Sequence, residues 1–288
     1  NWSNGGTFIP SSGTVVLMGS AKTITGTTVF NKVTVYGSYT VAGSDITYNG
    51  LLYVTATGSY AAGSGTATVN GDLTNSGTLT STGTTTFSGT SLQTIRLVNA
   101  LVSTSTGVVN FNGNVSPVFN STTTPIFANL NISNTAGINP SVNWRVIVSM
   151  TINSGGVFNG GNSTHTINGS FTNNGVVTSD GIISFEPTSA VAIKLSGTSF
   201  SSTGSVNFGG TGQITITGAP TALDEVRITN TNTAGITPPS GWTMAGDFII
   251  ANNSIFNAGS YTYNVGGDIE SNGTLNGGSS TFIMSSAA

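Results

Sequence analysis

The sequence contains no cysteine, which excludes disulfide bridges and thiolate metal sites, so its stability has to come from burial and backbone hydrogen bonds. Charge is scarce as well: charged residues make up 5% of the chain, against roughly 25% in an average soluble domain. The six Lys and Arg residues are spread without a cluster, so a nucleic-acid partner is not expected. No stretch approaches the ~20 apolar residues that span a bilayer, and no membrane span is predicted.

What is abundant is threonine, serine, asparagine and glycine, while 36% apolar residues remain available for a core. A polar surface that is poor in lysine and glutamate suits exposure to proteases and variable salt, which favours an extracellular or cell-surface location. The first ten residues show no basic region followed by an apolar one. We therefore expect any export signal to have been removed or to lie outside this segment.

The chain repeats itself at a fixed interval. "GDLTNSG" from Gly71 returns as "GSFTNNG" from Gly169 and as "GDIESNG" from Gly267, and both intervals are 98 residues. "TAGI" also recurs, at residues 135–138 and 233–236. An internal duplication of this kind predicts a repeat architecture. We interpret residues 1–288 as one continuous segment with super-repeats 1–70 (shortened), 71–168, 169–266 and 267–288 (partial).

Equivalent positions of the super-repeats keep their chemistry. Two of these positions are apolar in every copy and are predicted to lie in the core. A third position is always glycine and is predicted to lie at corners between strands. The apolar positions are Trp2, Leu73, Phe171 and Ile269, then Leu17, Phe87, Phe185 and Ile283, and the corner glycines are Gly6, Gly77, Gly175 and Gly273.

A finer period lies inside the super-repeat. Val54, Gly58 and Tyr60 recur 19 residues later as Leu73, Gly77 and Leu79. Short runs with period two predict strands, and glycine and asparagine tolerate the left-handed backbone of sharp corners. Short strands at constant spacing predict an all-β parallel β-solenoid with coils of about 19 residues. The alternative is a tandem of Ig-like β-sandwich modules, which would need longer strands and no finer period.

Phrases such as "NSGTLTSTGTTTFSGTSLQTI" (75–95) and "FANLNISNTAGI" (127–138) resemble the β-strand-repeat surface proteins of bacteria. These are similar to the β-helices of filamentous haemagglutinin and autotransporter passengers, and the resemblance covers essentially the whole chain. It rests on repeat style, without signature residues that could be carried over. The resemblance implies a segment of a large secreted or surface-attached protein that acts in adhesion, matrix or filament construction.

Catalytic candidates are few. His165 is the only histidine and stands where the next super-repeat has Tyr263, which favours a structural, outward or stacking aromatic role. Without a second His or a Cys there is no zinc set, and no nucleophile elbow surrounds a serine. We expect no catalytic site, no cofactor and no metal site.

Nine carboxylates remain to be weighed, because some parallel β-helices act on polysaccharides with converging acids. Asp72 and Asp268 occupy one repeat position, which Asn1 and Ser170 hold in the other copies, so a corner hydrogen bond explains both. Glu225 follows Asp224 directly and cannot share a strand face with it. A calcium ion at Asp268 and Glu270 is a minor possibility. The nine are Asp45, Asp72, Asp180, Glu186, Asp224, Glu225, Asp247, Asp268 and Glu270.

Threonine runs, two tryptophans and glycosylation sequons could each take part in binding or modification. Threonine-rich runs such as 78–87 could order water or a polysaccharide, but solvated strand residues explain them better. Trp144 and Trp242 follow Pro140 and Pro238 and could stack on a glycan, although a core role is favoured. Eight Asn-X-Ser/Thr sequons permit glycosylation, among them Asn114, Asn120, Asn131 and Asn162.

The sequence therefore predicts a non-catalytic extracellular rod, structural or adhesive, with a carbohydrate-binding or polysaccharide-degrading β-helix as the alternative. The expected partners are further repeats of the same chain or copies of itself end to end, with cell-surface or matrix polysaccharide as a further candidate. The sequence at both ends of the segment is typical of uncapped coils, and for this reason we expect further repeats or other copies of the chain as partners.

Overall fold

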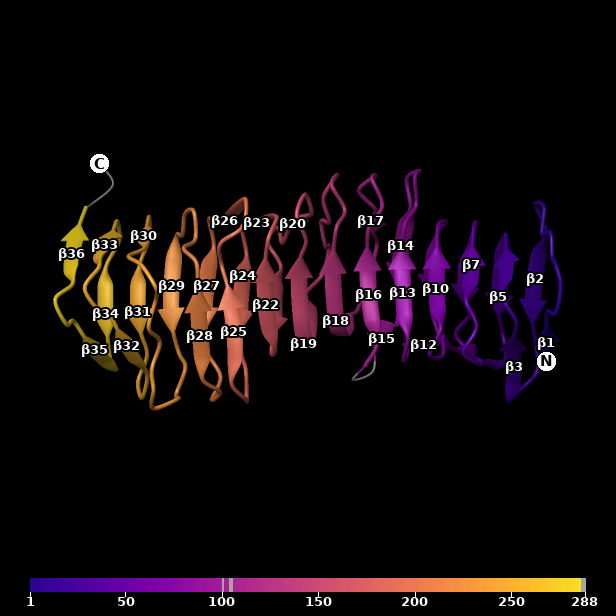
Figure 1. Cartoon of the computed structure of the whole chain (residues 1–288), viewed down its shortest axis with the longest axis horizontal. Coiled ribbons are helices and arrows are strands. Elements are labelled where there is room, and N and C mark those ends of the chain that lie inside the picture. Colours follow the sequence, from indigo (N-terminus) through magenta and orange to yellow (C-terminus); the bar gives the residue numbers. More distant parts are fainter. Residues whose placement is uncertain (100, 104–105, 286–288) are drawn as a thin grey trace. The chain divides into compact units, whose positions relative to one another are not determined.

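The computed structural model describes residues 1–99, 101–103 and 106–285, and within them there is no helix. The chain divides into two compact units, Asn1–Ile147 and Val148–Ala288. Short strands pair with the strand one coil further along, and the pairs in both units are parallel (Figure 1). The predicted all-β parallel β-solenoid is confirmed, and the Ig-like sandwich is wrong, because sandwich strands would pair antiparallel.

In the first unit three ladders of parallel strands run through successive coils. One holds β1 (Trp2–Ser3), β3 (Lys22–Thr25), β6 (Ser38–Val41), β9 (Ser59–Ala61), β12 (Thr78–Ser81), β15 (Leu101–Ser103) and the start of β18 (Ile126–Ile132). The next holds β4 (Thr28–Phe30), β7 (Ile46–Tyr48), β10 (Thr66–Val69), β13 (Thr84–Phe87), β16 (Val108–Phe111) and the end of β18. The third holds β2 (Thr14–Leu17), β5 (Lys32–Val35), β8 (Leu52–Val54), β11 (Leu73–Asn75), β14 (Thr94–Leu97) and β17 (Val118–Phe119).

The second unit follows the same plan. Strand β19 (Trp144–Ile152), whose C-terminal half lies in this unit, is followed in its ladder by β22 (Ser170–Asn173), β25 (Val191–Lys194) and β28 (Ile214–Thr217). The ladder that forms the candidate site holds β21 (Thr164–Ile167), β24 (Ile182–Phe185), β27 (Ser205–Phe208), β29 (Glu225–Ile228), β31 (Phe248–Ile250) and β34 (Ile269–Ser271), and is called the β24 ladder below. The shorter ladders are β20 (Val157–Asn159), β23 (Val176–Ser179) and β26 (Ser199–Ser202); β30 (Thr243–Met244), β33 (Thr262–Val265) and β36 (Thr281–Met284); and β32 (Ile255–Asn257) with β35 (Thr274–Asn276).

The coils differ in length, and their mean length is greater than the sequence predicted. Successive coils are roughly 21 residues apart, where the sequence echo indicated about 19. The shortest step pairs Lys22 with Tyr39, and a much longer one pairs Thr84 with Val108. The 19-residue echo is real, since Val33 pairs with Leu52, but loops of different length at the corners lengthen other coils.

The strands alternate between a buried and a solvent-facing side, as period two requires. In β10, β13 and β16 the second and fourth residues point inward. Inward aromatic rings stack from coil to coil: the centroids of Phe87 and Phe111 are 4.9 Å apart with an interplanar angle of 13°. Each coil thus buries its apolar side chains against the coils before and after it, which makes the stack mutually dependent.

Equivalent positions of the super-repeat do not share a ladder. In the second unit Phe171 lies in β22 and pairs with Met150 and Ile193, while Ile269 lies in β34 of the β24 ladder and pairs with Phe248. The reason is arithmetic: 98 residues are about four and two-thirds coils of roughly 21 residues. The super-repeat therefore conserves chemistry while it moves the equivalent residue to another face of the coil.

The predicted core positions fall into three groups. Those that lie in the core are Leu17, Leu73, Phe87, Phe171 and Phe185. Trp2 and Ile269 are half-buried. Ile283 is 45% exposed, which corrects the prediction for that residue. In β36, Phe282 and Met284 pair with the buried Tyr263 and Val265, so Ile283 occupies the outward register.

Three of the four corner glycines are required by close backbone approach. A Cβ on Gly77 would lie 2.2 Å from the carbonyl oxygens of Thr55 and Gly58, and one on Gly175 would lie 2.2 Å from the oxygen of Gly156. Gly273 is similarly close to Ala251, while Gly6 has open space. None of these four glycines has a positive φ, so the left-handed backbone expected at these corners is wrong.

The boundary between the two units lies inside β19, away from the super-repeat boundaries at 70/71 and 168/169. The compact units are therefore defined by contacts rather than by the duplication. The grouping of residues 1–288 into super-repeats of one segment stays a prediction.

Candidate functional site

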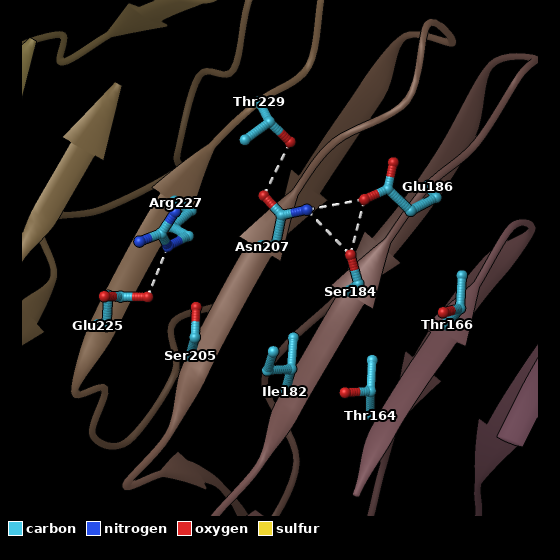
Figure 2. Close-up of a pocket in the computed structure, with 10 residues that line it drawn as sticks. All are labelled: Thr164, Thr166, Ile182, Ser184, Glu186, Ser205, Asn207, Glu225, Arg227 and Thr229. Carbon is cyan, nitrogen blue, oxygen red and sulfur yellow. Dashed lines mark hydrogen bonds and ion pairs between the residues drawn. The ribbon is translucent and has the colours of Figure 1, made fainter. Parts of the chain in front are cut away.

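The candidate site is a groove of about 500 Å³ on the outward face of the β24 ladder (Figure 2). Four strands, β21, β24, β27 and β29, form its floor. Its lining is polar and aliphatic and holds no aromatic ring: Thr164, Thr166, Ile182, Ser184, Glu186, Ser205, Asn207, Glu225, Arg227 and Thr229.

Strand register determines which of these side chains are neighbours. Thr166, Ser184, Asn207 and Arg227 follow one another across the four strands, each paired with the next. Within a strand the lining residues are two positions apart, as side chains on one face must be. Adjacent strands lie ~4.8 Å apart, so each of these residues is within reach of the next.

A hydrogen-bond network orients the carboxylate of Glu186. Its Oε1 accepts hydrogen bonds from Ser184 Oγ and from Asn207 Nδ2, both at 2.7 Å. Asn207 Nδ2 also donates to Ser184 Oγ at 2.9 Å, and Asn207 Oδ1 accepts from Thr229 Oγ1 at 2.9 Å. Residues of three neighbouring coils thus fix the Glu186 carboxylate, because Ser184 and Asn207 both bind it and Asn207 is in turn held by Thr229.

An ion pair occupies another part of the groove. Arg227 Nε donates to Glu225 Oε1 at 2.7 Å. This hydrogen bond is the main cause that lowers the pKa of Glu225, with burial opposing it, and it raises the pKa of Arg227. Both groups stay charged at neutral pH, so the pair contributes no net charge to the groove.

The two glutamates are far apart in the strand register. The register places their backbones about four residues apart along the strands and two strands apart, on the order of 16 Å. Carboxyl groups of glycosidases lie ~5–9.5 Å apart. Here each carboxylate is also bound by its own partner, Glu186 by Asn207 and Glu225 by Arg227.

Most other carboxylates support corners between coils. Asp72 Oδ1 accepts from the Thr94 amide at 2.8 Å, and Asn1 Oδ1 accepts from the Thr23 amide at 3.0 Å. Asp45 and Asp247 accept amides of the following coil in the same way, from Thr66 and Asp268. The predicted corner hydrogen bond is present at Asn1 and Asp72. At Asp268 the backbone amide donates, to Asp247, and the carboxylate is not the acceptor in that bond.

Replacing Asp72 by Ala is expected to lower stability by about 0.5–1 kcal/mol, because the Thr94 amide loses its acceptor at an exposed corner where water partly replaces it. Asp72→Asn should stay within a few tenths of the parent, since Asn1 makes the equivalent bond. Urea unfolding of both variants checks this. If Asp72→Asn proved as unstable as Asp72→Ala, the corner role would be contradicted.

His165 lies in the core, where its ring is 2% exposed. Its Nε2 bonds the Gly160 carbonyl at 2.9 Å, and its ring packs edge-on to Phe158. Tyr263 repeats the arrangement: its hydroxyl donates to the Ala258 carbonyl at 2.9 Å, and its ring packs edge-on to Phe256. Burial lowers the pKa of His165, which keeps it neutral at pH 7. Its contacts match the structural aromatic role, while an outward placement is wrong, because the residue is buried.

Neither tryptophan offers a face to a glycan. Trp144 is 2% exposed and packs against Phe111, Phe119 and Phe127. Trp242 is 1% exposed and stacks on Phe208 at 5.4 Å. Glycan stacking on either indole is therefore wrong as a prediction, and the core role is what the structure shows.

Asp268 and Glu270, the pair considered for a calcium ion, each make a hydrogen bond of their own. Asp268 donates its amide to Asp247, and Glu270 Oε1 accepts from Asn272 Nδ2 at 2.6 Å. Within residues 1–99, 101–103 and 106–285 there is no group of three or more His, Asp or Glu residues that could hold a metal ion.

Threonine columns are short. Thr66 pairs with Thr84 and Thr68 with Thr86, but the next strand places Val108 and Asn110 in these columns. Among the sequons, Asn114, Asn120 and Asn162 are exposed. Asn131 is half-buried in β18, where its Nδ2 donates to Asn110 Oδ1 at 2.9 Å. Asn1, Asn252 and Asn272 are exposed sequons as well, so these six are the ones open to modification.

Sequence reasoning did not identify the groove, although it named Glu186 and Glu225 as carboxylates. Two signals were present: "SFE" at 184–186 and "EVRIT" at 225–229 place polar residues at alternate positions. What joins them is register across coils of unequal length, which no fixed period supplies.

Within the described part of the chain no helix is long and apolar enough to cross a membrane. Comparisons with protein-family models, with curated proteins and with solved structures found no match to this chain.

Proposed function

We propose that this chain is a non-catalytic scaffold, a β-solenoid segment of an extracellular or cell-surface protein that serves in adhesion or in building filaments. One observation carries the proposal. Side-chain hydrogen bonds in both units mainly join residues 18 to 26 positions apart, which is one coil to the next. Polar groups are used for stacking coils rather than for assembling a reaction centre.

Buried asparagines are the clearest example. Asn75 and Asn173 are fully buried and equivalent in the super-repeat. In each, Oδ1 accepts the amide of the corner glycine two residues on, and Nδ2 donates to carbonyls of the next coil. Buried polar groups are costly unless bonded, so these residues define where a coil turns.

The partners proposed for a scaffold of this kind are further repeats or other copies of the chain. Parallel coil-to-coil pairing is open-ended, since each coil pairs with neighbours on both sides. Carbohydrate binding or degradation stays the alternative, and it could not use Trp144 or Trp242, because both are buried. The groove of the β24 ladder is one candidate surface for it.

The test combines imaging with a surface assay. Electron microscopy of the purified chain should show elongated particles or filaments, and beads coated with the chain should adhere to cells or matrix without turnover of any glycan. Turnover of a polysaccharide that is lost in Glu186→Gln or Glu225→Gln would overturn the scaffold role in favour of the enzyme alternative.

A further inference from the structure

Glu186 is a half-buried carboxylate, and among the described residues it has no ion-pair partner. The ion pair found among the described residues joins Arg227 to Glu225 instead. Both hydrogen bonds that Glu186 accepts end on Oε1, and its Oε2 receives none from the described residues. One oxygen of a fixed anion is therefore available to a ligand (Figure 2).

The position of this carboxylate depends on a glycine. A Cβ on Gly209 would lie 2.5 Å from both carboxylate oxygens of Glu186. Gly209 has no positive φ, so glycine is not needed there for the backbone. Its missing side chain leaves the space in which the carboxylate lies, and Asn207 and Ser184 hold it there.

The remaining lining decides the class of ligand. With Arg227 and Glu225 paired, the groove carries one net negative charge, which favours cations and disfavours anions. Its floor also offers an aliphatic side chain, that of Ile182, which is 40% exposed and lies among the lining residues with Thr164 and Thr166. A ligand that places an ammonium on Glu186 and methylenes on this floor complements both features.

We propose that this groove binds a lysine side chain of a partner polypeptide, with its ammonium on Glu186. A single unpaired carboxylate holds one ammonium, whereas a polyamine would need a row of them, and Glu225 is already bound by Arg227. The groove lies open on a sheet face, which suits a side chain presented on another chain. This goes beyond the scaffold role, since coils stack without it.

The probe is Nα-acetyl-lysine-N-methylamide, titrated into the isotope-labelled 288-residue chain and followed by amide chemical shifts. Shifts should be saturable, should gather on β24, β27 and β29, and should weaken with added salt. The norleucine analogue, which lacks the ammonium, should not saturate. Glu186→Gln should weaken binding about tenfold, the factor that ~1.4 kcal/mol represents.

Gly209→Ala gives an independent test, because it keeps the charge and moves the carboxylate, and it should weaken binding to a similar degree. Asp180→Asn is the matched control: it removes one charge from an exposed corner, where Asp180 accepts from Thr203, and should leave binding unchanged. Thermal unfolding of each variant verifies that the fold persists.

Several results would overturn the proposal: equal binding of the norleucine analogue, unchanged affinity in Glu186→Gln, no saturable shifts, or saturation by spermidine but not by the lysine probe. Shifts of the same amides by a neutral oligosaccharide alone would assign the groove to a glycan instead. None of these outcomes bears on elongated particles or bead adhesion, so the scaffold role is tested separately.

Discussion

Replacing Asn173 by Ala is expected to destabilise the second unit by about 3 kcal/mol. The side chain is fully buried, its Nδ2 donates to the carbonyls of Leu195 at 3.3 Å and Ser199 at 2.9 Å, and its Oδ1 accepts the Gly175 amide at 3.1 Å. The substitution leaves these backbone groups without partners where water has no access, and each such loss costs ~1–3 kcal/mol. Urea unfolding followed by circular dichroism measures the change.

Asn159→Ala is the matched control. Asn159 makes the same kind of turn, since its Oδ1 accepts the Gly161 amide at 3.1 Å, but it is exposed. Water can replace that bond, so a loss of about 0.5 kcal/mol or less is expected. Asn173→Asp should be at least as harmful as Asn173→Ala, because it keeps the acceptor but removes the donor and buries a charge. Equal stability of the Asn173→Ala and Asn159→Ala variants would contradict the role given to buried asparagines.

The fold class could be predicted from the sequence because its signals are local and redundant. Period two in runs such as 84–87 predicts short strands, and their repetition near every 19 residues predicts stacking. The sequence also predicts the corner acceptor at Asn1 and Asp72 from their equivalence, and the aromatic role of His165 from Tyr263. In each case one position determines one local interaction.

Register could not be predicted in the same way. Loops between strands differ in length, so a fixed period no longer predicts, after a few coils, which side chains point inward. At Ile283 the predicted register is wrong by one residue. A shift of one residue moves a side chain to the opposite face. Gly77, Gly175 and Gly273 show a related limit, because each is required by a backbone carbonyl of the preceding coil and not by its neighbours in the sequence.

The candidate site depends on the same long-range register. Glu186, Asn207 and Thr229 come from three coils, and only the pairing of Ser184 with Asn207 and of Asn207 with Arg227 brings them together. A duplication of 98 residues gives no help here, because equivalent positions move to another face of the coil. Which residues meet in the site therefore depends on the lengths of the coils. Those lengths are set by the loops, which do not follow a fixed period.

His165 is expected to make the second unit sensitive to mild acid. Burial lowers its folded pKa, against the opposing Gly160 hydrogen bond, while the unfolded value is ~6.5. Well above that value both states are neutral and the contribution to stability is complete. As pH falls below ~6.5 the unfolded chain gains the proton first, so the free energy of unfolding decreases by up to ~1.4 kcal/mol per pH unit until the folded pKa is reached.

The exchange of His165 and Tyr263 isolates this effect. His165→Tyr should remove the decrease between about pH 7 and pH 5, because the tyrosine hydroxyl can donate to Gly160 as Tyr263 does to Ala258, and it does not titrate there. Tyr263→His should add a second decrease of the same sign. Carboxylates contribute little in this window, since ordinary Asp and Glu values lie near ~4. The measurement is the difference in unfolding free energy, or in Tm, across this pH range for each variant.

The two exchanges also separate charge from packing. A misfit of the larger tyrosine ring at position 165, or a cavity beside histidine at position 263, changes the free energy of unfolding by the same amount at about pH 7 and at about pH 5. Protonation of histidine changes the dependence of that free energy on pH. A parallel pH dependence of the parent and the His165→Tyr variant would contradict a buried neutral histidine. If the slope instead follows the number of histidines at this repeat position, the interior of each coil accepts a polar ring only in its uncharged form, which is why tyrosine and histidine can alternate there.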